Sequence, residues 1–241
     1  MQHTNGFLIR SACPSDCNAV VALEERVWKR LGVKPITPRL FREWARAHQE
    51  GLLLAFEGKE LRGYTYVEYV HFNPHSLAAP AWDELVRTQH TRAHHTPSGN
   101  AVFGASVAAD PPGKGAGQAL LERVISLSIA QRKEYLITFS RMPGFSSYMA
   151  LAREHGAREE EATLARSYGV LSMRLLGSEA IGPARGFHVP SHLPSVDMKD
   201  PVMGLFATAL GMSFFDVVPT VDSDPQSSNL AALMVRSFSY S

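Results

Sequence analysis

The clearest pattern of apolar and polar positions covers residues 102–129. Its first part, 102–109, is mostly apolar without a helical period, which is typical of a buried strand. The segment Asp110-Pro111-Pro112 should end this strand, because proline has no N–H to continue a ladder. A glycine-rich turn follows at 113–117. Beyond it, apolar positions recur three and four residues apart and predict an amphipathic helix with a buried stripe of Leu120, Leu121, Val124 and Ile125.

Similar patterns predict the other elements. We expect strands within 6–12, at 52–56 and 63–70 around a hairpin turn, at 135–139, ending at 217–219, and from 229 to 233. Helices should begin at Ser15 or Asp16 and end at Gly32, and begin at Thr37-Pro38 and end at Gly51. A helix-like stretch covers 148–176, and a last helix begins at the cap Asp200. The order predicts an α/β fold with a mixed, twisted central sheet flanked by helices.

The strand at 63–70 alternates, so that Tyr64, Tyr66 and Glu68 should point to one face of the sheet. One interpretation is a half-exposed aromatic face with a structural role. The other is a substrate wall, with Glu68 as a proton acceptor or an amine ligand.

The glycine-rich turn is suited to anion binding. A helix start leaves backbone N–H groups without partners and carries partial positive charge, and glycine lets the backbone approach a phosphate. A P-loop would need Ser or Thr after the lysine that closes its motif, whereas Gln118 and Ala119 follow Gly117 here. The spacing and the late position also disagree with a dinucleotide-binding fingerprint. A glycine-rich loop without a ligand stays open as an alternative.

The segment resembles motif A of the GNAT superfamily of acetyl-CoA-dependent N-acetyltransferases. Gly115 and Gly117 match the glycine positions of the motif, and Ala119, Leu120 and Leu121 match the start of its helix. Pro112 stands where the motif has Arg or Gln, which removes one donor and one side chain from the pyrophosphate cradle. The order of elements over the first 130 residues is also the GNAT order.

This resemblance implies acetyl-CoA as the acyl donor. It assigns hydrogen bonds with the pantetheine arm to the backbone of the strand before the turn, and the pyrophosphate to the turn itself. The residues implied to bind the donor are Ser106, Val107, Ala108, Ala109, Gly113, Lys114, Gly115, Ala116, Gly117 and Gln118.

Two flanking segments resemble a GNAT subgroup associated with nitrilase-like amidohydrolases. One is the run from Arg141 to Phe145. The other is the C-terminal series Asp200-Pro201-Val202-Met203, then Gly211, Val217-Val218-Pro219 and an acidic turn at 222–225. The stretch 149–195 fits this pattern less well, and we expect it to be an insertion in a single domain that covers 1–241.

The reaction implied is transfer of an acetyl group to a primary amine of a small molecule or amino acid derivative. Such a transfer needs a neutral amine, a polarised thioester carbonyl and a protonated leaving thiolate. Glu68, through a water, is the candidate base, and Tyr148 is the candidate acid. Many GNAT enzymes place a tyrosine where this chain has Ala207. The alternative function is therefore an acyl-CoA-binding sensor or binding module without turnover.

Composition and charge indicate which classes of binding partner to expect. The chain has 241 residues, a net charge of +1 and 20% charged residues, so we expect neither nucleic acid nor an anionic membrane as a partner. Neither an apolar leader nor a run of 18 apolar residues is present, which predicts a cytoplasmic protein. The sequence is compatible with a homodimer, and the acceptor is expected to be a small molecule.

Metal binding is not expected. Cys13 and Cys17 form a single pair, and we expect reduced structural thiols. His71, His75, His90, His94 and His95 lie in a polar connection, where His90 and His94 have a spacing that can hold a metal. Since no acidic residue is placed to complete such a site, we expect solvated loop histidines.

Overall fold

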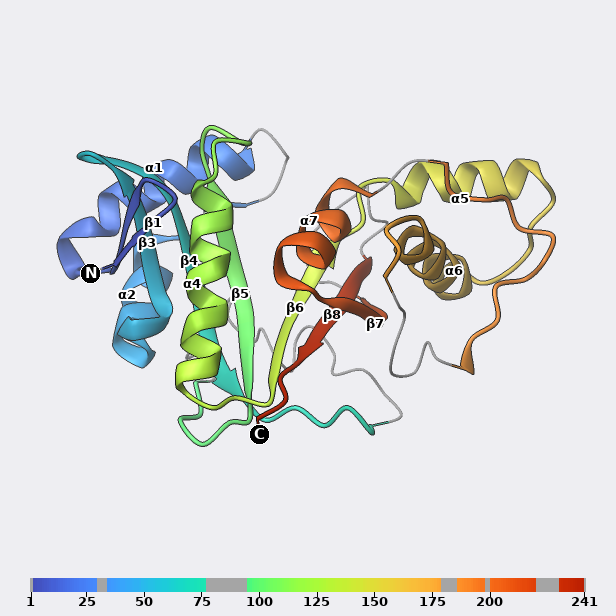
Figure 1. Cartoon of the computed structure of the whole chain (residues 1–241). Coiled ribbons are helices and arrows are strands. Elements are labelled where there is room, and N and C mark those ends of the chain that lie inside the picture. Colours follow the sequence, from blue (N-terminus) through green and yellow to red (C-terminus); the bar gives the residue numbers. More distant parts are fainter. Residues whose placement is uncertain are drawn as a thin grey trace. The chain divides into compact units, whose positions relative to one another are not determined.

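The structure is a computed structural model that describes residues 2–29, 34–76, 95–178, 186–197, 200–219 and 230–240. The chain divides into two compact units. The first contains residues 1–72, 85–136 and 237–241, and the second contains 73–84 and 137–236. Figure 1 labels helices and strands of both units.

The first unit is built on a run of antiparallel strands in the order β1-β2-β3-β4-β5. Their bounds are β1 Gln2–Thr4, β2 Phe7–Ser11, β3 Leu52–Glu57, β4 Glu60–Val70 and β5 Ala101–Ala109. The strands from β2 to β5 were expected from the sequence. Strand β1 was not expected, and it pairs with β2 through a turn at Asn5-Gly6, where both residues have positive φ. An Asn-Gly pair is a strong hairpin signal, so this strand could have been predicted from the sequence.

Helices cover both faces of these strands. Helices α1 Cys17–Trp28 and α2 Pro38–Ala47 pack on each other, α1 packs on β4 and β5, and α4 Ala116–Ala130 packs on β2 to β5. Tyr64 on β4 reaches α1, whereas a Cβ on the neighbouring Gly63 would lie 3.1 Å from Leu120 of α4. Successive residues of a strand face opposite sides, so α1 and α4 lie on opposite faces of the sheet.

The start of α2 confirms its predicted cap, whereas the predicted cap of α1 makes no side-chain bond to that helix. The hydroxyl of Thr37 accepts from the Leu40 N–H at 3.2 Å, and Pro38 is the first residue of α2. At α1, a short 3₁₀ turn, η1 Pro14–Asp16, precedes the helix, and the Asp16 carboxylate accepts from the Cys13 N–H at 2.8 Å. The sequence therefore located these starts, although Asp16 caps the 3₁₀ turn and not α1 itself.

The second unit contains most of β6 Tyr135–Arg141, followed by β7 Ser213–Pro219 and β8 Leu230–Ser237, in the order β6-β8-β7. Strands β7 and β8 are antiparallel. The helices of this unit are α5 Phe145–Glu154, α6 Glu161–Leu175 and α7 Pro201–Leu210. The helix-like stretch expected at 148–176 is therefore two helices, because Gly156 takes a positive φ that interrupts it.

Buried Asp200 organises the second unit. Its Oδ1 accepts from the N–H groups of Val202 and Met203 at 3.0 Å, which confirms the predicted cap of α7. Its Oδ2 accepts from the Tyr168 hydroxyl at 2.7 Å and from the Gly144 N–H at 3.3 Å. This carboxylate thus joins α6, α7 and the start of α5. The acidic turn at 222–225 and the helix-like piece at 81–87 lie outside the described residues.

Candidate functional site

The predicted strand–turn–helix motif is present in the first unit. Strand β5 ends at Ala109, immediately before Asp110-Pro111-Pro112, and α4 begins at Ala116. Gly113 has φ 75° and Gly115 has φ 93°, a region that side chains other than glycine rarely adopt. Gly115 is the N-cap residue of α4, and no side chain caps this helix start. The first-turn N–H groups of α4 therefore have no acceptor within the helix.

Small residues let the turn lie against the end of β5. A Cβ on Gly117 would stand 3.7 Å from the Cβ of Ala109, and Ala116 is buried. Gly113, Lys114 and Gln118 are exposed, and Gly115 and Gly117 are half-buried. The structure thus brings the predicted turn residues and the end of β5 together at one positively polarised helix start.

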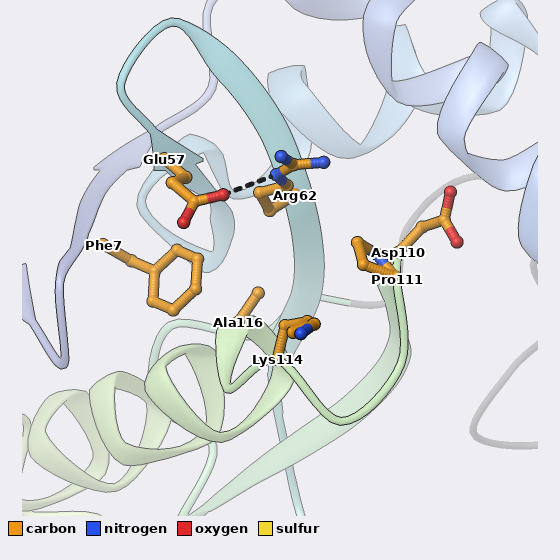
Figure 2. Close-up of a pocket in the computed structure, with 7 residues that line it drawn as sticks. All are labelled: Phe7, Glu57, Arg62, Asp110, Pro111, Lys114 and Ala116. Carbon is orange, nitrogen blue, oxygen red and sulfur yellow. Dashed lines mark hydrogen bonds and ion pairs between the residues drawn. The ribbon is translucent and has the colours of Figure 1, made fainter.

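A pocket of about 210 Å³ lies beside this turn. It is lined by the turn, by the β3–β4 hairpin and by β2, as Figure 2 shows. Its lining residues are Phe7, Glu57, Arg62, Asp110, Pro111, Lys114 and Ala116.

Most charges of this pocket are paired. Arg62 bonds Glu57 at 2.9 Å and Glu60 at 2.7 Å (Figure 2 draws the Glu57 bond), and Asp110 bonds Arg26 at 3.1 Å. Lys114 has no ion pair with any of the residues that the structure describes. Its ammonium group is therefore the charge available to an anion at the turn.

The predicted strand residues lie on β5, opposite β4. Ser106 pairs with Tyr66, Val107 with Thr65, Ala108 with Tyr64 and Ala109 with Gly63. The register then shifts, because Val67 pairs with Gly104, and Ala105 is the extra residue of a β-bulge. The Thr65 hydroxyl donates to the Ser106 carbonyl at 2.8 Å and holds the strand in place beside the bulge.

A buried carboxylate that the sequence analysis did not identify lies on the α1 face of β4. Glu24 of α1 is 2% exposed and accepts from Trp28 Nε1 at 2.6 Å, from the Ile36 N–H at 3.0 Å and from the Tyr64 hydroxyl. The Tyr64 oxygen lies 2.7 Å from Ser106 Oγ. Burial raises the pKa of Glu24, and the three donors oppose this shift. The sequence contained a sign of this burial, because Glu24 lies next to Leu23 on the apolar side of the predicted helix.

The two predicted catalytic residues are both buried. Glu68 of β4 is 1% exposed, and Tyr148 of α5 is 5% exposed. Glu68 belongs to the first unit and Tyr148 to the second. Burial, and then the charge of Glu159, raise the pKa of Tyr148 to about 12. Their roles as base and acid stay predictions.

The face formed by Tyr64, Tyr66 and Glu68 is not half-exposed, so that interpretation is wrong. Tyr64 and Tyr66 are fully buried, and Trp44 of α2 stacks on Tyr66 with ring centroids 4.5 Å apart. Burial and the neighbouring carboxylate of Glu68 raise the pKa of Tyr66 well above its usual value. The helices α1 and α2 cover this face, which the alternation of the strand could not show.

Two histidines stack at the end of β4. The rings of His48 and His95 are 4.0 Å apart, and Tyr69 contacts both. Lys133 lies 4.0 Å above the Tyr69 ring. Burial, His48 and Lys133 together lower the pKa of His95 to about 4. The expectation of solvated loop histidines is therefore wrong for His95, while His90 and His94 lie outside the described residues.

The remaining predictions concern the two cysteines, metal ligands and membrane spans. Cys13 and Cys17 are free cysteines. Among the described residues, no group of three or more potential ligands could hold a metal ion. No helix in the described part of the chain is long and apolar enough to span a membrane.

Solved structures resemble this chain over nearly its whole length. GphF, a GNAT-like decarboxylase in complex with isobutyryl-CoA, matches with a TM-score of 0.66 at 20% identity, covering 95% of this chain and 98% of its own. The loading GNATL domain of CurA from Lyngbya majuscula matches with a TM-score of 0.63 at 15% identity, covering 97% and 98%. The protein yncA from Salmonella typhimurium, solved with acetyl-CoA, matches with a TM-score of 0.50 at 16% identity, covering 98% and 96%.

The chain therefore has the GNAT fold, a mixed α/β sheet flanked by helices, as the strand–turn–helix motif suggested. Two of these neighbours were solved with an acyl-CoA bound. The sequence matches no family model and no curated protein. The nitrilase-associated subgroup stays a prediction.

Proposed function

We propose that this protein is an acyl-CoA-dependent transferase that moves an acetyl group from acetyl-CoA to a primary amine of a small molecule or amino acid derivative. The observation that carries the proposal is the uncapped start of α4 behind Gly113 and Gly115, in a chain with the GNAT fold. Such a helix start binds a pyrophosphate through backbone N–H groups and the helix dipole.

The residues around the turn fit the donor. Gly113 and Gly115 expose the backbone, and Lys114 supplies the cation that is free of ion pairs with described residues. Pro112 is exposed beside the turn and has no N–H to donate, which leaves the cradle to residues 113–118. Backbone groups of Ser106 to Ala109 would bind the pantetheine arm.

Glu68 and Tyr148 are the proposed base and acid of this reaction. A tyrosine with a pKa near 12 keeps its proton at neutral pH, as a donor to a leaving thiolate must. Glu68 would act through a water, since its side chain is buried.

The first test is calorimetric titration of the whole chain with acetyl-CoA, repeated with Gly115→Trp. We expect micromolar binding that the bulky side chain abolishes. Gly156→Trp is the matched control, because Gly156 also has a positive φ but lies in the second unit, with no atom within 4 Å of its Cβ position. Absence of binding to the unmodified protein would end the proposal.

A second candidate function is an acyl-CoA-binding module without turnover, and Ala207 favours it. This residue is buried in α7 at the position where many GNAT enzymes carry the tyrosine acid. Free thiol released from acetyl-CoA with a panel of primary amines separates the two functions. Binding without thiol release would favour the module.

A further inference from the structure

Glu24, Tyr64 and Ser106 form a hydrogen-bonded chain from the interior of the first unit to β5. Glu24 is on α1, Tyr64 on β4 and Ser106 on β5, so these residues are 40 and 42 positions apart along the sequence. Glu24 and Tyr64 are buried, and Ser106 is half-buried. The chain of bonds therefore leads from a buried carboxylate to a hydroxyl with partial access to solvent.

The direction of every bond in this chain is determined by chemistry. An ionised Glu24 can only accept, so Tyr64 donates its single hydroxyl hydrogen to it. The Tyr64 oxygen can then only accept from Ser106, at 2.7 Å. Ser106 donates inward, which leaves the lone pairs of its oxygen available to accept a proton from outside the chain.

Among the described residues, the groups that donate to the Glu24 carboxylate are neutral. Trp28 Nε1 and the Tyr64 hydroxyl donate to Oε1, and the Ile36 N–H donates to Oε2. Burial favours the neutral acid and makes the carboxylate a stronger base than an exposed glutamate. Glu24 therefore takes up a proton more readily than an exposed glutamate does.

Ser106 lies next to a β-bulge in β5, beside the hydrogen-bonded residues Glu24 and Tyr64. Ser106 pairs with Tyr66, and the extra residue Ala105 separates it from the regular ladder of Gly104. Bulges change the direction of a side chain at a strand, often next to a functional site. The Thr65 hydroxyl holds the Ser106 carbonyl at 2.8 Å, so the main chain on which the hydroxyl stands is anchored.

We infer that Ser106 receives the amine proton in the proposed transfer as it passes its own proton inward, and that Tyr64 and Glu24 act through it, with the Glu24 carboxylate as the final acceptor. This inference rests on the proposed function, because the donor is placed beside Ser106 by the acyl-CoA site. It offers a base different from Glu68, with a defined path for the proton.

With an amine acceptor, the transfer forms one C–N bond, breaks one C–S bond and moves one proton along the hydrogen-bonded residues. The amine nitrogen forms a bond to the thioester carbonyl carbon, and its proton passes to Ser106 Oγ. The Ser106 proton moves to Tyr64 and the Tyr64 proton to Glu24, which becomes a carboxylic acid. The C–S bond then breaks, and the thiolate takes up one proton from the acid of the reaction, for which Tyr148 is the proposed residue; that acid regains a proton from solvent. Glu24 returns its proton to solvent along the same chain, so the products are an amide and free CoA.

The experiment compares Ser106→Ala, Ser106→Thr and Tyr64→Phe with the unmodified chain. Free thiol release from acetyl-CoA is measured between pH 5 and 9 with ethylamine, benzylamine and glycinamide as probe amines, and with water alone. Acetyl-CoA affinity is measured by calorimetry on the same samples. Ser128→Ala is the matched control, because this buried hydroxyl on α4 donates to the Val124 carbonyl of its own helix at 2.8 Å.

We expect Ser106→Ala and Tyr64→Phe to lower kcat on the order of 100-fold, the size of a lost general base. Acetyl-CoA affinity should change less than twofold. Ser106→Thr keeps the hydroxyl and should restore most of the rate, and Ser128→Ala should match the unmodified chain. In the unmodified chain kcat should fall at acidic pH as Glu24 takes up its proton, and this fall should disappear in Tyr64→Phe. If the three hydrogen-bonded side chains had only a structural role, their substitution would not change the pH dependence of kcat.

Each failure has a separate meaning. Full rates in Ser106→Ala and Tyr64→Phe overturn the relay and leave the proposed transferase in place. Acetyl-CoA binding without thiol release under any condition overturns both the relay and the transfer, and favours the binding module. Absence of acetyl-CoA binding overturns the proposed function itself. Glu24→Gln is a weaker test, because its amide would place a donor against another donor, either the Ile36 N–H or the Tyr64 hydroxyl.

Discussion

The glycine-rich turn and the hydrogen-bonded residues Glu24, Tyr64 and Ser106 lie in the same unit. The turn depends on its backbone, whereas the three residues depend on their side chains. The turn would bind its proposed ligand through backbone N–H groups, and its side chains are mostly absent or exposed. The hydrogen-bonded chain uses three side chains from three elements, two of them buried. A backbone site tolerates side-chain changes that do not add bulk, whereas a buried side-chain site fails when one partner is lost.

The largest effect should come from removing the carboxylate of the buried chain. Glu24→Ala leaves the hydrogen-bond donors of Trp28, Ile36 and Tyr64 without their acceptor in the interior. We expect the free energy of unfolding to fall by about 3–5 kcal/mol, as for a broken buried polar network. Urea unfolding followed by circular dichroism measures this change.

The control for this prediction is the next residue on the same helix. Glu25 is exposed, so Glu25→Ala should change the free energy of unfolding by less than about 0.5 kcal/mol. Equal effects of the two substitutions would mean that helix propensity, and not the buried chain, determines the stability of α1.

A smaller effect is expected from pH, through the stacked histidines. The pKa of His95 is lowered to about 4 by burial, His48 and Lys133, and burial also lowers the pKa of His48. The unfolded chain binds protons at these histidines near pH 6.5, while the folded chain does so only at a lower pH. Their stability contribution is therefore complete above about pH 6.5 and is lost as the pH falls toward 4.

Because His95 is only half-buried, solvent screening reduces this contribution, and we expect a loss of about 2 kcal/mol over that range. Replacing His95 with Gln should flatten the dependence of Tm on pH. The control is His75→Asn, since His75 is exposed. An unchanged slope in the His95 variant would show that other groups control the acid sensitivity.

The smallest effect concerns the turn, where side chains contribute least. Lys114→Ala removes one exposed cation beside the uncapped start of α4. We expect acetyl-CoA affinity to fall about fivefold, or about 1 kcal/mol, and this difference to shrink at high salt. Lys29→Ala, at the exposed end of α1, should not alter the affinity. A loss as large as that of Gly115→Trp would mean that Lys114, and not the backbone, holds the donor.

The sequence was informative where the signal is local. Gly113, Gly115 and Gly117 directly precede an amphipathic period, and this order predicted the turn and the start of α4 correctly. The caps Thr37 and Asp200 were also predicted, because a cap bonds N–H groups only two or three residues away. Such features depend on neighbouring residues and need no knowledge of the fold.

The same reasoning failed where distant segments meet. The alternation of β4 showed that Tyr64, Tyr66 and Glu68 share a face, but the coverage of that face by Trp44 and Glu24 comes from α1 and α2. His95 was placed in a solvated loop because its stacking partner, His48, lies 47 positions away in the sequence. Burial of a polar group depends on what packs over it, and a pattern along one strand contains no such information.

The sequence by itself thus determined the strand–turn–helix motif, the alternation of β4 and the caps of α2 and α7, because these depend on residues within one or two helical turns of each other. Only the tertiary structure decided that Glu24 bonds Tyr64 and Tyr64 reaches Ser106. Those contacts exist because α1, β4 and β5 pack together around a common core, and the free energy of that packing is shared by the whole unit.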